Sequence, residues 1–191
     1  MNTLKNIRDI IEKISELNLS TDKSIIIAID GRCASGKTTL AKTLKNTLNC
    51  NLFHADDYFL LPEQRTAERL RIPGGNFDIE RFYNEIILGL KSGNNFSYSP
   101  FNCSTMSLSE PVYVTKTKIN IIEGSYSCHP DIINNYDLTL FVTTDKKIQK
   151  ERILQRNKLN SEMFFSKWIP LEENYFNHFD IENKCDYVFY T

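Results

Sequence analysis

The chain has 191 residues, of which 41% are hydrophobic and 25% charged, and its formal net charge is −1. These values favour a single globular domain over residues 1–191 and disfavour a general surface for nucleic acids or anionic membranes. No apolar run is long enough to span a membrane, and the charged start of the chain is unlike a signal peptide. Five scattered cysteines without a C-x-x-C pair indicate reduced thiols, so we expect a cytoplasmic protein.

Short apolar runs alternate with stretches of helical periodicity through the first half of the chain. A run that is apolar on both faces predicts a buried parallel strand, and apolar residues every three to four positions predict an amphipathic helix. Asp78 is expected to cap the last of these helices and Gly93 to stop it. In chain order, the predicted elements are a helix at 3–17, a strand at 24–30, a helix ending near Leu48, a strand at 51–54, a short helix at 66–70 and a helix at 79–92.

The second half of the chain continues this alternation after a small β-hairpin. In chain order, the predicted elements are the hairpin at 96–114, strands at 118–122 and 138–142, helices at 145–157 and 162–178, and a strand at 186–190. Strands that alternate with helices imply a parallel sheet covered on both faces. We therefore predict an α/β protein, a three-layer α/β/α sandwich with a five-stranded parallel core sheet, in which ligands bind beyond the carboxyl ends of the strands.

Residues 31–38 read Gly-Arg-Cys-Ala-Ser-Gly-Lys-Thr and fill the pattern G-x-x-x-x-G-K-[ST] between a predicted strand and a predicted helix. Backbone N–H groups in such a loop, together with the helix N-terminus, bind the phosphates of a nucleoside triphosphate. Lys37 can reach the β- and γ-phosphates, and the Thr38 hydroxyl can bind Mg²⁺. The residues expected to contact the nucleotide are Gly31, Arg32, Cys33, Ala34, Ser35, Gly36, Lys37, Thr38 and Thr39.

Cys33 lies inside this loop and has two interpretations. It is a small spacer in the first, which we favour. In the second it is a redox-sensitive thiol, because a helix N-terminus lowers the pKa of a thiol.

Carboxylates follow two predicted strands. Asp56 and Asp57 come after the strand at 51–54, and Glu123 comes after the strand at 118–122. If both strands flank the strand at 24–30, one carboxylate can accept a proton from a substrate hydroxyl and another can hold the metal with Thr38, mostly through water. The alternative is that the paired aspartates only form a turn or cap a helix.

Two groups of arginines extend this expected site. Arg152 and Arg156 lie one helical turn apart, so they can close over the phosphates as a lid, although a solvated basic face is the alternative. Arg71 belongs to a cluster with Arg65 and Arg69 in the 60–77 loop, which faces either the substrate or the solvent.

These motifs, in this order, resemble those of the uridine kinase-like group of P-loop kinases, which also includes nicotinamide riboside, pantothenate and phosphoribulose kinases. The resemblance implies the P-loop NTPase fold with a phosphate loop at 31–38, an acceptor-site insertion at about 60–115 and a helical lid at about 145–165. It rests on the phosphate loop, His54-Ala55-Asp56-Asp57-Tyr58-Phe59, Gly75-Asn76-Phe77-Asp78, Glu123-Gly124 and Glu151-Arg152-Ile153-Leu154-Gln155-Arg156.

The resemblance implies a kinase that moves the γ-phosphate of ATP to a hydroxyl of a nucleoside, uridine- or cytidine-like, with Mg²⁺. In this interpretation Asp56 is the base, Asp78 binds ribose hydroxyls, and Lys37, Glu123, Arg152 and Arg156 serve the reaction. The metal is held by Thr38, Asp57 and Glu123. Acceptor contacts are expected from Asp56, Tyr58, Asp78, Phe101 and Arg71.

Two departures from the family pattern leave the acceptor open: the lid has fewer arginines than is usual in the group, and the segment after the hairpin differs. Uridine kinases carry an aromatic residue and a His after their hairpin, whereas residues 99–103 here read Ser-Pro-Phe-Asn-Cys. Phe101 can stack on a base or pack in the core. A non-nucleoside alcohol, pantothenate- or sugar-like, therefore remains an alternative acceptor, and assembly into a homo-oligomer is also left open.

Two other classes of protein compete with a kinase. Asn183-Lys184-Cys185-Asp186 fills the guanine-reading pattern of GTPases, but it precedes a predicted strand instead of following one, and the strand at 118–122 ends in Glu-Gly instead of Asp-x-x-Gly. A nucleotide-binding protein without catalysis is disfavoured because Lys37, Thr38, Asp56 and Glu123 are all present.

Overall fold

A parallel sheet of six strands organises the computed structural model, which describes residues 2–156 and 161–191. Its order is β1-β10-β9-β2-β8-β3, and every neighbouring pair is parallel. The central strand β2 therefore has β8 and β9 as its neighbours. The strands are β1 (Asn2–Leu4), β2 (Ile25–Gly31), β3 (Cys50–His54), β8 (Ile119–Glu123), β9 (Leu138–Thr143) and β10 (Tyr187–Tyr190).

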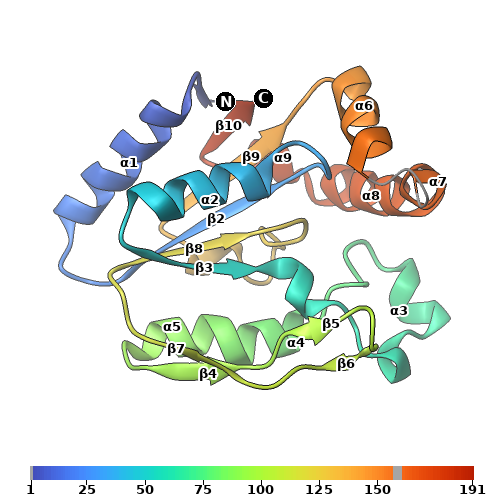
Figure 1. Ribbon diagram of the computed structural model, residues 1–191, viewed down its shortest axis with the longest axis horizontal. Coiled ribbons are helices and arrows are strands. Elements are labelled where there is room, and N and C mark those ends of the chain that lie inside the picture. Colours follow the sequence, from blue (N-terminus) through green and yellow to red (C-terminus); the bar gives the residue numbers. More distant parts are fainter. Residues whose placement is uncertain (1, 157–160) are drawn as a thin grey trace.

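Helices cover both faces of this sheet, as the sequence predicts (Figure 1). Alternate side chains of β2 point to opposite faces, because a strand has a period of two. Ile25, Ile27 and Ile29 pack with α1 (Ile7–Ser20) and α2 (Lys37–Thr47). Ile26 and Ala28 pack on the other face with a cluster that includes residues of α4 (Ile79–Phe82), α5 (Leu88–Ser92) and α8 (Ile169–Phe179). The predicted three-layer α/β/α sandwich is confirmed.

The sixth strand corrects the prediction of five. Residues 2–4 pair with β10 at the edge of the sheet, where the sequence predicts the start of a helix. Asn6 explains the difference, because its side chain accepts a hydrogen bond from the backbone N–H of Asp9 and caps α1. The helix cannot begin before this cap, so Leu4, which fits the helical periodicity, is buried from a strand instead.

Two helices contain a π-helical turn in their middle. Tyr83–Ile87 joins α4 to α5, and Phe164–Trp168 joins α7 (Ser161–Met163) to α8. Asp78 caps α4 through the N–H of Arg81, and Gly93 ends α5 in the left-handed conformation, as predicted. The remaining α-helices are α3 (Ala67–Arg71), α6 (Lys146–Arg156) and α9 (Ile181–Lys184), and short 3₁₀ helices lie at Ala55–Tyr58, Pro62–Gln64 and Ile133–Asn135.

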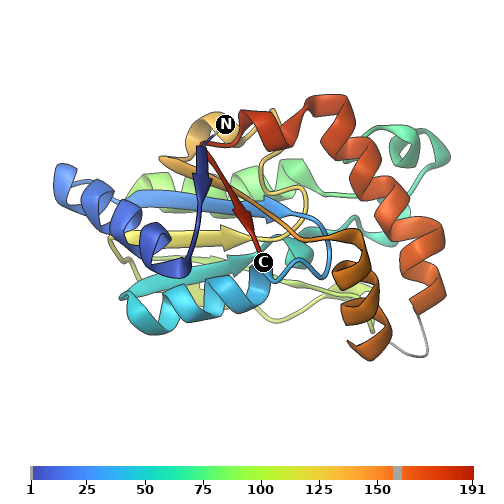
Figure 2. The same cartoon turned by 90° about the horizontal axis from the view of Figure 1, so that it is seen from above.

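The predicted hairpin excursion is present as two small antiparallel pairs. They are β4 (Phe96–Tyr98) with β7 (Val112–Val114), and β5 (Phe101–Asn102) with β6 (Ser107–Leu108). In Figure 1 these pairs and α3 lie below the sheet, and α6–α8 lie beside the carboxyl ends of the strands. Figure 2 shows α6 and α8 together beyond the carboxyl ends of the strands. The predicted lid at 145–165 thus includes α6 and α7, and its residues 157–160 lie outside the described part of the chain.

No helix within the described residues is both long and apolar enough to cross a membrane.

Candidate active site

The phosphate loop links β2 to α2 through two glycines with positive φ. Gly31, the last residue of β2, has φ +136°, and a Cβ on it would lie 1.9 Å from the carbonyl oxygen of Val142 in β9. Gly36 has φ +96° and precedes the first residue of α2. Lys37 is buried, and its Nζ donates to the carbonyl oxygens of Gly31 at 2.6 Å and Arg32 at 2.9 Å. The lysine is therefore held over the loop in which it is expected to contact phosphate.

Asp30 fixes the entrance to this loop. Its fully buried carboxylate accepts hydrogen bonds from the N–H groups of Gly31 at 2.7 Å, Tyr126 at 3.2 Å and Cys128 at 2.9 Å, and from the hydroxyl of Tyr175 at 2.9 Å. Burial raises the pKa of Asp30 to about 6, although the hydrogen bonds oppose this rise. One side chain thus joins the phosphate loop, the segment after β8 and helix α8. Asp30 was not among the site residues predicted from the sequence.

Side chains from the C-terminal third of the chain hold the loop from its other side. Gln149 in α6 donates to the carbonyl oxygen of Cys33 at 2.9 Å, and Arg152 donates to that of Ala34 at 3.3 Å. Thr191 donates to the carbonyl oxygen of Ser35 at 2.7 Å. The loop conformation therefore depends on contacts far away in the sequence.

Arg32 and Cys33 are also held by this C-terminal third. The guanidinium of Arg32 pairs with Glu173 at 2.7 Å and Glu182 at 3.2 Å. The pKa of the Cys33 thiol is raised to about 12, first by burial and then by the Glu172 carboxylate. The structure therefore does not support the redox-sensitive interpretation of Cys33, since a reactive thiol requires a lowered pKa.

Glu123 and Thr38 meet at the carboxyl ends of β8 and the start of α2. The Thr38 hydroxyl lies 3.2 and 3.3 Å from the two carboxylate oxygens of Glu123, which is buried. The Nδ1 atom of His54 lies 2.6 Å from Oε1 of Glu123, and this hydrogen bond raises the pKa of His54. The structure thus brings together two of the three residues expected to serve a metal.

These oxygen atoms fit Mg²⁺ in the way nucleotide-binding proteins hold it, with one or two carboxylates and the remaining positions filled by phosphates and water. Within residues 2–156 and 161–191, no cluster of three or more His, Cys, Asp or Glu side chains could hold a metal without such help. Asp57, the third expected ligand, is absent from the cavity wall, and its backbone carbonyl accepts a hydrogen bond from Arg81 at 2.9 Å.

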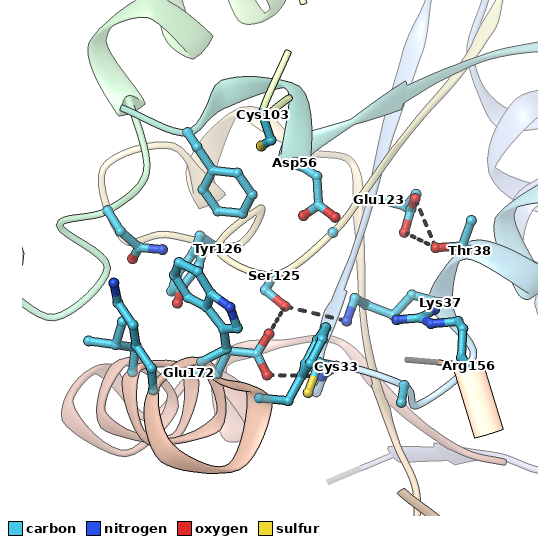
Figure 3. A pocket seen from close by; sticks show the side chains of 18 of the residues that line it. Cys33, Lys37, Thr38, Asp56, Cys103, Glu123, Ser125, Tyr126, Arg156 and Glu172 are labelled. Carbon is cyan, nitrogen blue, oxygen red and sulfur yellow. Dashed lines mark hydrogen bonds between the residues drawn. The ribbon is translucent and has the colours of Figure 1, made fainter. Parts of the chain in front are cut away.

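A cavity of about 1220 Å³ connects the phosphate loop to Asp56 (Figure 3). Asp56 is exposed to the cavity, and partial desolvation by the cavity walls raises the pKa of its carboxyl, which the nearby Lys37 partly offsets. In Figure 3 the Asp56 carboxylate points into the space above Ser125, on the side of the cavity away from Arg156. The predicted site residues that line the cavity are Cys33, Ala34, Gly36, Lys37, Thr38, Thr39, Asp56, Glu123, Arg152 and Arg156.

The wall opposite the phosphate loop is largely aromatic and apolar. Phe59 and Trp168 stack with ring centroids 6.5 Å apart, and Tyr126, which packs against Phe77 and Tyr175, also lines the cavity. Asn76 contributes an amide nitrogen that is buried and has no hydrogen-bond partner among the described residues. The guanidinium of Arg65, anchored by its Nε to the carbonyl of Leu60 at 2.9 Å, also lines this wall.

Four of the expected acceptor contacts lie away from the cavity surface. Tyr58 is fully buried and donates to Glu85 at 2.9 Å. Asp78 is buried as the cap of α4 and pairs with Arg81 at 3.4 Å, which agrees with its helix-cap interpretation. Phe101 is buried in the fold, which agrees with core packing, and Arg71 is exposed beyond the cavity wall.

The sequence analysis missed several residues that line the cavity. Local patterns do not distinguish them, because each lies in a loop or helix whose position depends on tertiary packing. Asn76 belongs to a segment that resembles a family motif, and Arg65 belongs to the arginine cluster predicted to face either the substrate or the solvent, but neither was predicted as a site residue. The missed residues are Phe59, Arg65, Asn76, Ser125, Tyr126, Trp168 and Glu172.

Several solved structures share this architecture. A structure from Bacillus stearothermophilus described as a possible uridine kinase is 22% identical, with a TM-score of 0.71 over 96% of this chain and 98% of that chain. A candidate fructose transport system kinase from Silicibacter sp. TM1040 is 18% identical, with a TM-score of 0.65 over 96% and 98% of the two chains. YFH7 from Saccharomyces cerevisiae, a candidate P-loop kinase with a circular permutation, is 14% identical, with a TM-score of 0.68 over 97% and 98%.

The chain has the P-loop kinase fold. The similarity to a uridine kinase-like structure extends over almost the whole chain, so it includes the sheet, the insertion and the helices beside the phosphate loop. No protein-family model and no curated protein matches the sequence.

In this P-loop kinase fold, the guanine-reading pattern at 183–186 has a structural role. Asp186 accepts hydrogen bonds from the backbone N–H and the hydroxyl of Thr139, both at 2.8 Å, and so joins β10 to β9. Asn183 bonds to Asp180 at 2.7 Å. Neither side chain lines the cavity, so the structure gives the GTPase alternative no support.

Proposed function

We propose that this protein is an ATP-dependent kinase that transfers the γ-phosphate of ATP to a hydroxyl group of a small molecule. One observation carries the proposal: Lys37 of the phosphate loop and the Asp56 carboxylate line the same cavity, whose volume of about 1220 Å³ is large enough for two ligands. The triphosphate occupies the loop side and the acceptor alcohol occupies the aromatic side.

The residues divide the work of phosphoryl transfer. Loop N–H groups and Lys37 hold the phosphates and offset charge that develops on them. Asp56 accepts the proton of the acceptor hydroxyl while the oxygen of that hydroxyl forms a bond to the γ-phosphorus. The bond between the γ-phosphorus and the β-γ bridging oxygen breaks, and ADP leaves. The raised pKa of Asp56 makes its ionised carboxylate a stronger base. Mg²⁺, held through Thr38 and Glu123, would neutralise phosphate charge.

A nucleoside, uridine- or cytidine-like, is the first acceptor that we propose. The overall similarity to a possible uridine kinase supports it. The partly exposed rings of Phe59 and Trp168 in the cavity wall offer flat surfaces on which a base can stack.

A non-nucleoside alcohol is the second candidate, and a specific observation favours it. Asp78, the carboxylate that the resemblance assigns to ribose hydroxyls, is buried against Arg81 and the start of α4. An acceptor without a ribose diol would not need this carboxylate. The aromatic wall then holds an apolar part of a different alcohol.

An acceptor screen tests the proposal. The protein is incubated with Mg-ATP and a panel of nucleosides, hydroxy acids and sugars, and the products are identified by mass spectrometry. We expect at least one acceptor to yield equal amounts of ADP and phosphorylated product. The control is Lys37→Ala, which should lose the transfer. A folded protein that binds Mg-ATP by calorimetry, yet phosphorylates no member of a broad panel, would contradict the proposal.

A further inference from the structure

Glu172 in helix α8 is a buried carboxylate that contacts the phosphate loop. Its Oε2 accepts a hydrogen bond from the backbone N–H of Cys33 at 2.9 Å, and its Oε1 accepts one from the Ser125 hydroxyl at 2.7 Å (Figure 3). Only 7% of the surface of this residue is exposed, and it lines the cavity. An anionic side chain therefore already uses one N–H group of a loop whose N–H groups are expected to hold phosphate.

Glu172 also reaches Lys37 through a single side chain. The Ser125 hydroxyl that bonds to Glu172 lies 3.4 Å from Nζ of Lys37. Figure 3 shows Glu172, Ser125 and Lys37 linked in a row by two hydrogen bonds. A triphosphate bound at this loop places negative charge next to the Glu172 carboxylate, and like charges in a buried site repel strongly. Nucleotide binding therefore disfavours the position that Glu172 holds.

The continuous helical segment 161–179, which contains Glu172, also carries part of the acceptor wall. Trp168 precedes Glu172 by four residues, the spacing that places two side chains on one helix face. The π-helical turn that ends at Trp168 runs directly into α8, and both residues line the cavity. Trp168 stacks on Phe59 with centroids 6.5 Å apart. One helix face thus contacts the donor loop and the acceptor wall.

Two contacts directly after Glu172 hold α8 in place: Glu173 pairs with Arg32 at 2.7 Å, and Tyr175 bonds to Asp30. The hydroxyl of Tyr175, three residues after Glu172, donates to the buried Asp30 at 2.9 Å. This bond holds the middle of α8 to the end of β2. A change at Glu172 therefore acts on the N-terminal end of the helix, where Trp168 lies.

We propose that Glu172 is a positioning residue that couples occupancy of the phosphate loop to the position of Trp168. When a triphosphate occupies the loop, the Glu172 carboxylate leaves the Cys33 N–H, and the start of α8 shifts Trp168 relative to Phe59. The acceptor wall thereby reaches its working position only after the donor is bound. This inference rests on the nucleotide-binding part of the proposed function and does not depend on the identity of the acceptor.

Trp168 is the single tryptophan of the chain, so its fluorescence reports this movement directly. The probe is a non-hydrolysable ATP analogue with Mg²⁺, titrated into the protein while Trp168 emission and acrylamide quenching are recorded. Calorimetry on the same samples measures nucleotide binding. We expect the wild type to bind the analogue and to change both emission and quenching.

Glu172→Gln tests the role of the charge. The neutral amide keeps the shape of the side chain and is not repelled by phosphate, so the variant should bind the analogue roughly tenfold more tightly and lose the Trp168 response. Glu172→Ala removes the anchor, so Trp168 should be more accessible to acrylamide even without nucleotide. Glu162→Gln is the matched control, because it removes an exposed carboxylate from the same helical segment, 161–179. This variant should keep the full change in Trp168 fluorescence.

The outcomes separate the inference from the proposed function. If Glu172→Gln binds the analogue and keeps a wild-type Trp168 response, or if the wild type binds without any response, the coupling role is wrong and the kinase proposal stands. If the wild type does not bind the analogue at all, the proposed function fails and the coupling role fails with it.

Discussion

Asp30 links the start of the phosphate loop to two other parts of the fold. Its carboxylate receives four hydrogen bonds from three different parts of the fold, although it is fully buried and close to Lys37. The hydrogen bonds favour the ionised form, but burial has the larger effect on the pKa. The protein therefore places a carboxylate where its ionisation has a cost in stability, which predicts a distinct dependence of stability on pH.

The raised pKa of Asp30, about 6 in the folded protein, means that the folded state binds this proton more tightly than the unfolded chain. The stabilisation is complete below the unfolded pKa near 3.9 and is lost as the pH rises through about 6. A shift of about two units corresponds to about 3 kcal/mol. Asp30→Asn removes this titration. Between about pH 4 and pH 7 the wild type should lose about 3 kcal/mol of unfolding free energy that the variant does not lose, so the stability difference changes by about 3 kcal/mol in favour of the variant.

Urea unfolding at a series of pH values measures this shift. Asp30→Asn should be less stable overall, because an amide cannot accept all four hydrogen bonds, but the change with pH is what identifies the carboxylate. Asp22→Asn, at an exposed position after α1, is the control and should follow the wild-type pH profile. Parallel profiles for Asp30→Asn and the wild type would show that the Asp30 titration does not contribute.

At the scale of elements, the junction of β2 with the phosphate loop has no room for a side chain. Gly31 pairs with Val142 of β9, and a Cβ at Gly31 would fall 1.9 Å from the Val142 carbonyl oxygen. The positive φ of Gly31 adds strain for any other residue. The close approach of β2 and β9 therefore depends on this glycine.

Gly31→Ala should lower the free energy of unfolding by at least about 2 kcal/mol, because both a backbone clash and an unfavourable φ must be accommodated. Urea unfolding measures the loss. Gly93→Ala is the matched control, since Gly93 also has a positive φ but its nearest neighbour would be 3.8 Å from the new Cβ. The control should lose only about 1 kcal/mol. Similar losses in the two variants would mean that the Val142 contact does not restrict Gly31.

Most elements could be predicted from the sequence because their signals are local. The strand at 24–30 is apolar on both faces, and Asp78 and Gly93 mark the ends of one helix. Strand β1 was missed because three residues are too few to show a period and Leu4 also fits the helix that follows. Only its pairing with β10 at the far end of the chain makes it a strand.

At the scale of the whole molecule, the donor side of the site was more predictable than the acceptor side. Lys37 and Thr38 belong to a contiguous motif, and Asp56 and Glu123 follow strands, so parallel topology brings them together. Asp78 shows the limit of a local motif, since its carboxylate is used within the fold. Glu172 and Trp168 meet the cavity only because α8 packs beside the loop, and no local pattern in the sequence predicts that contact.

The central claim is that Asp56 and the phosphate loop act together as a phosphotransferase site. The most direct measurement compares the wild type with Asp56→Asn, both for transfer of the γ-phosphate to the acceptor found by screening and for Mg-ATP binding by calorimetry. Loss of the base should lower the transfer rate by at least about 10²-fold, while the affinity for Mg-ATP changes little. Transfer by Asp56→Asn at the wild-type rate would contradict the account.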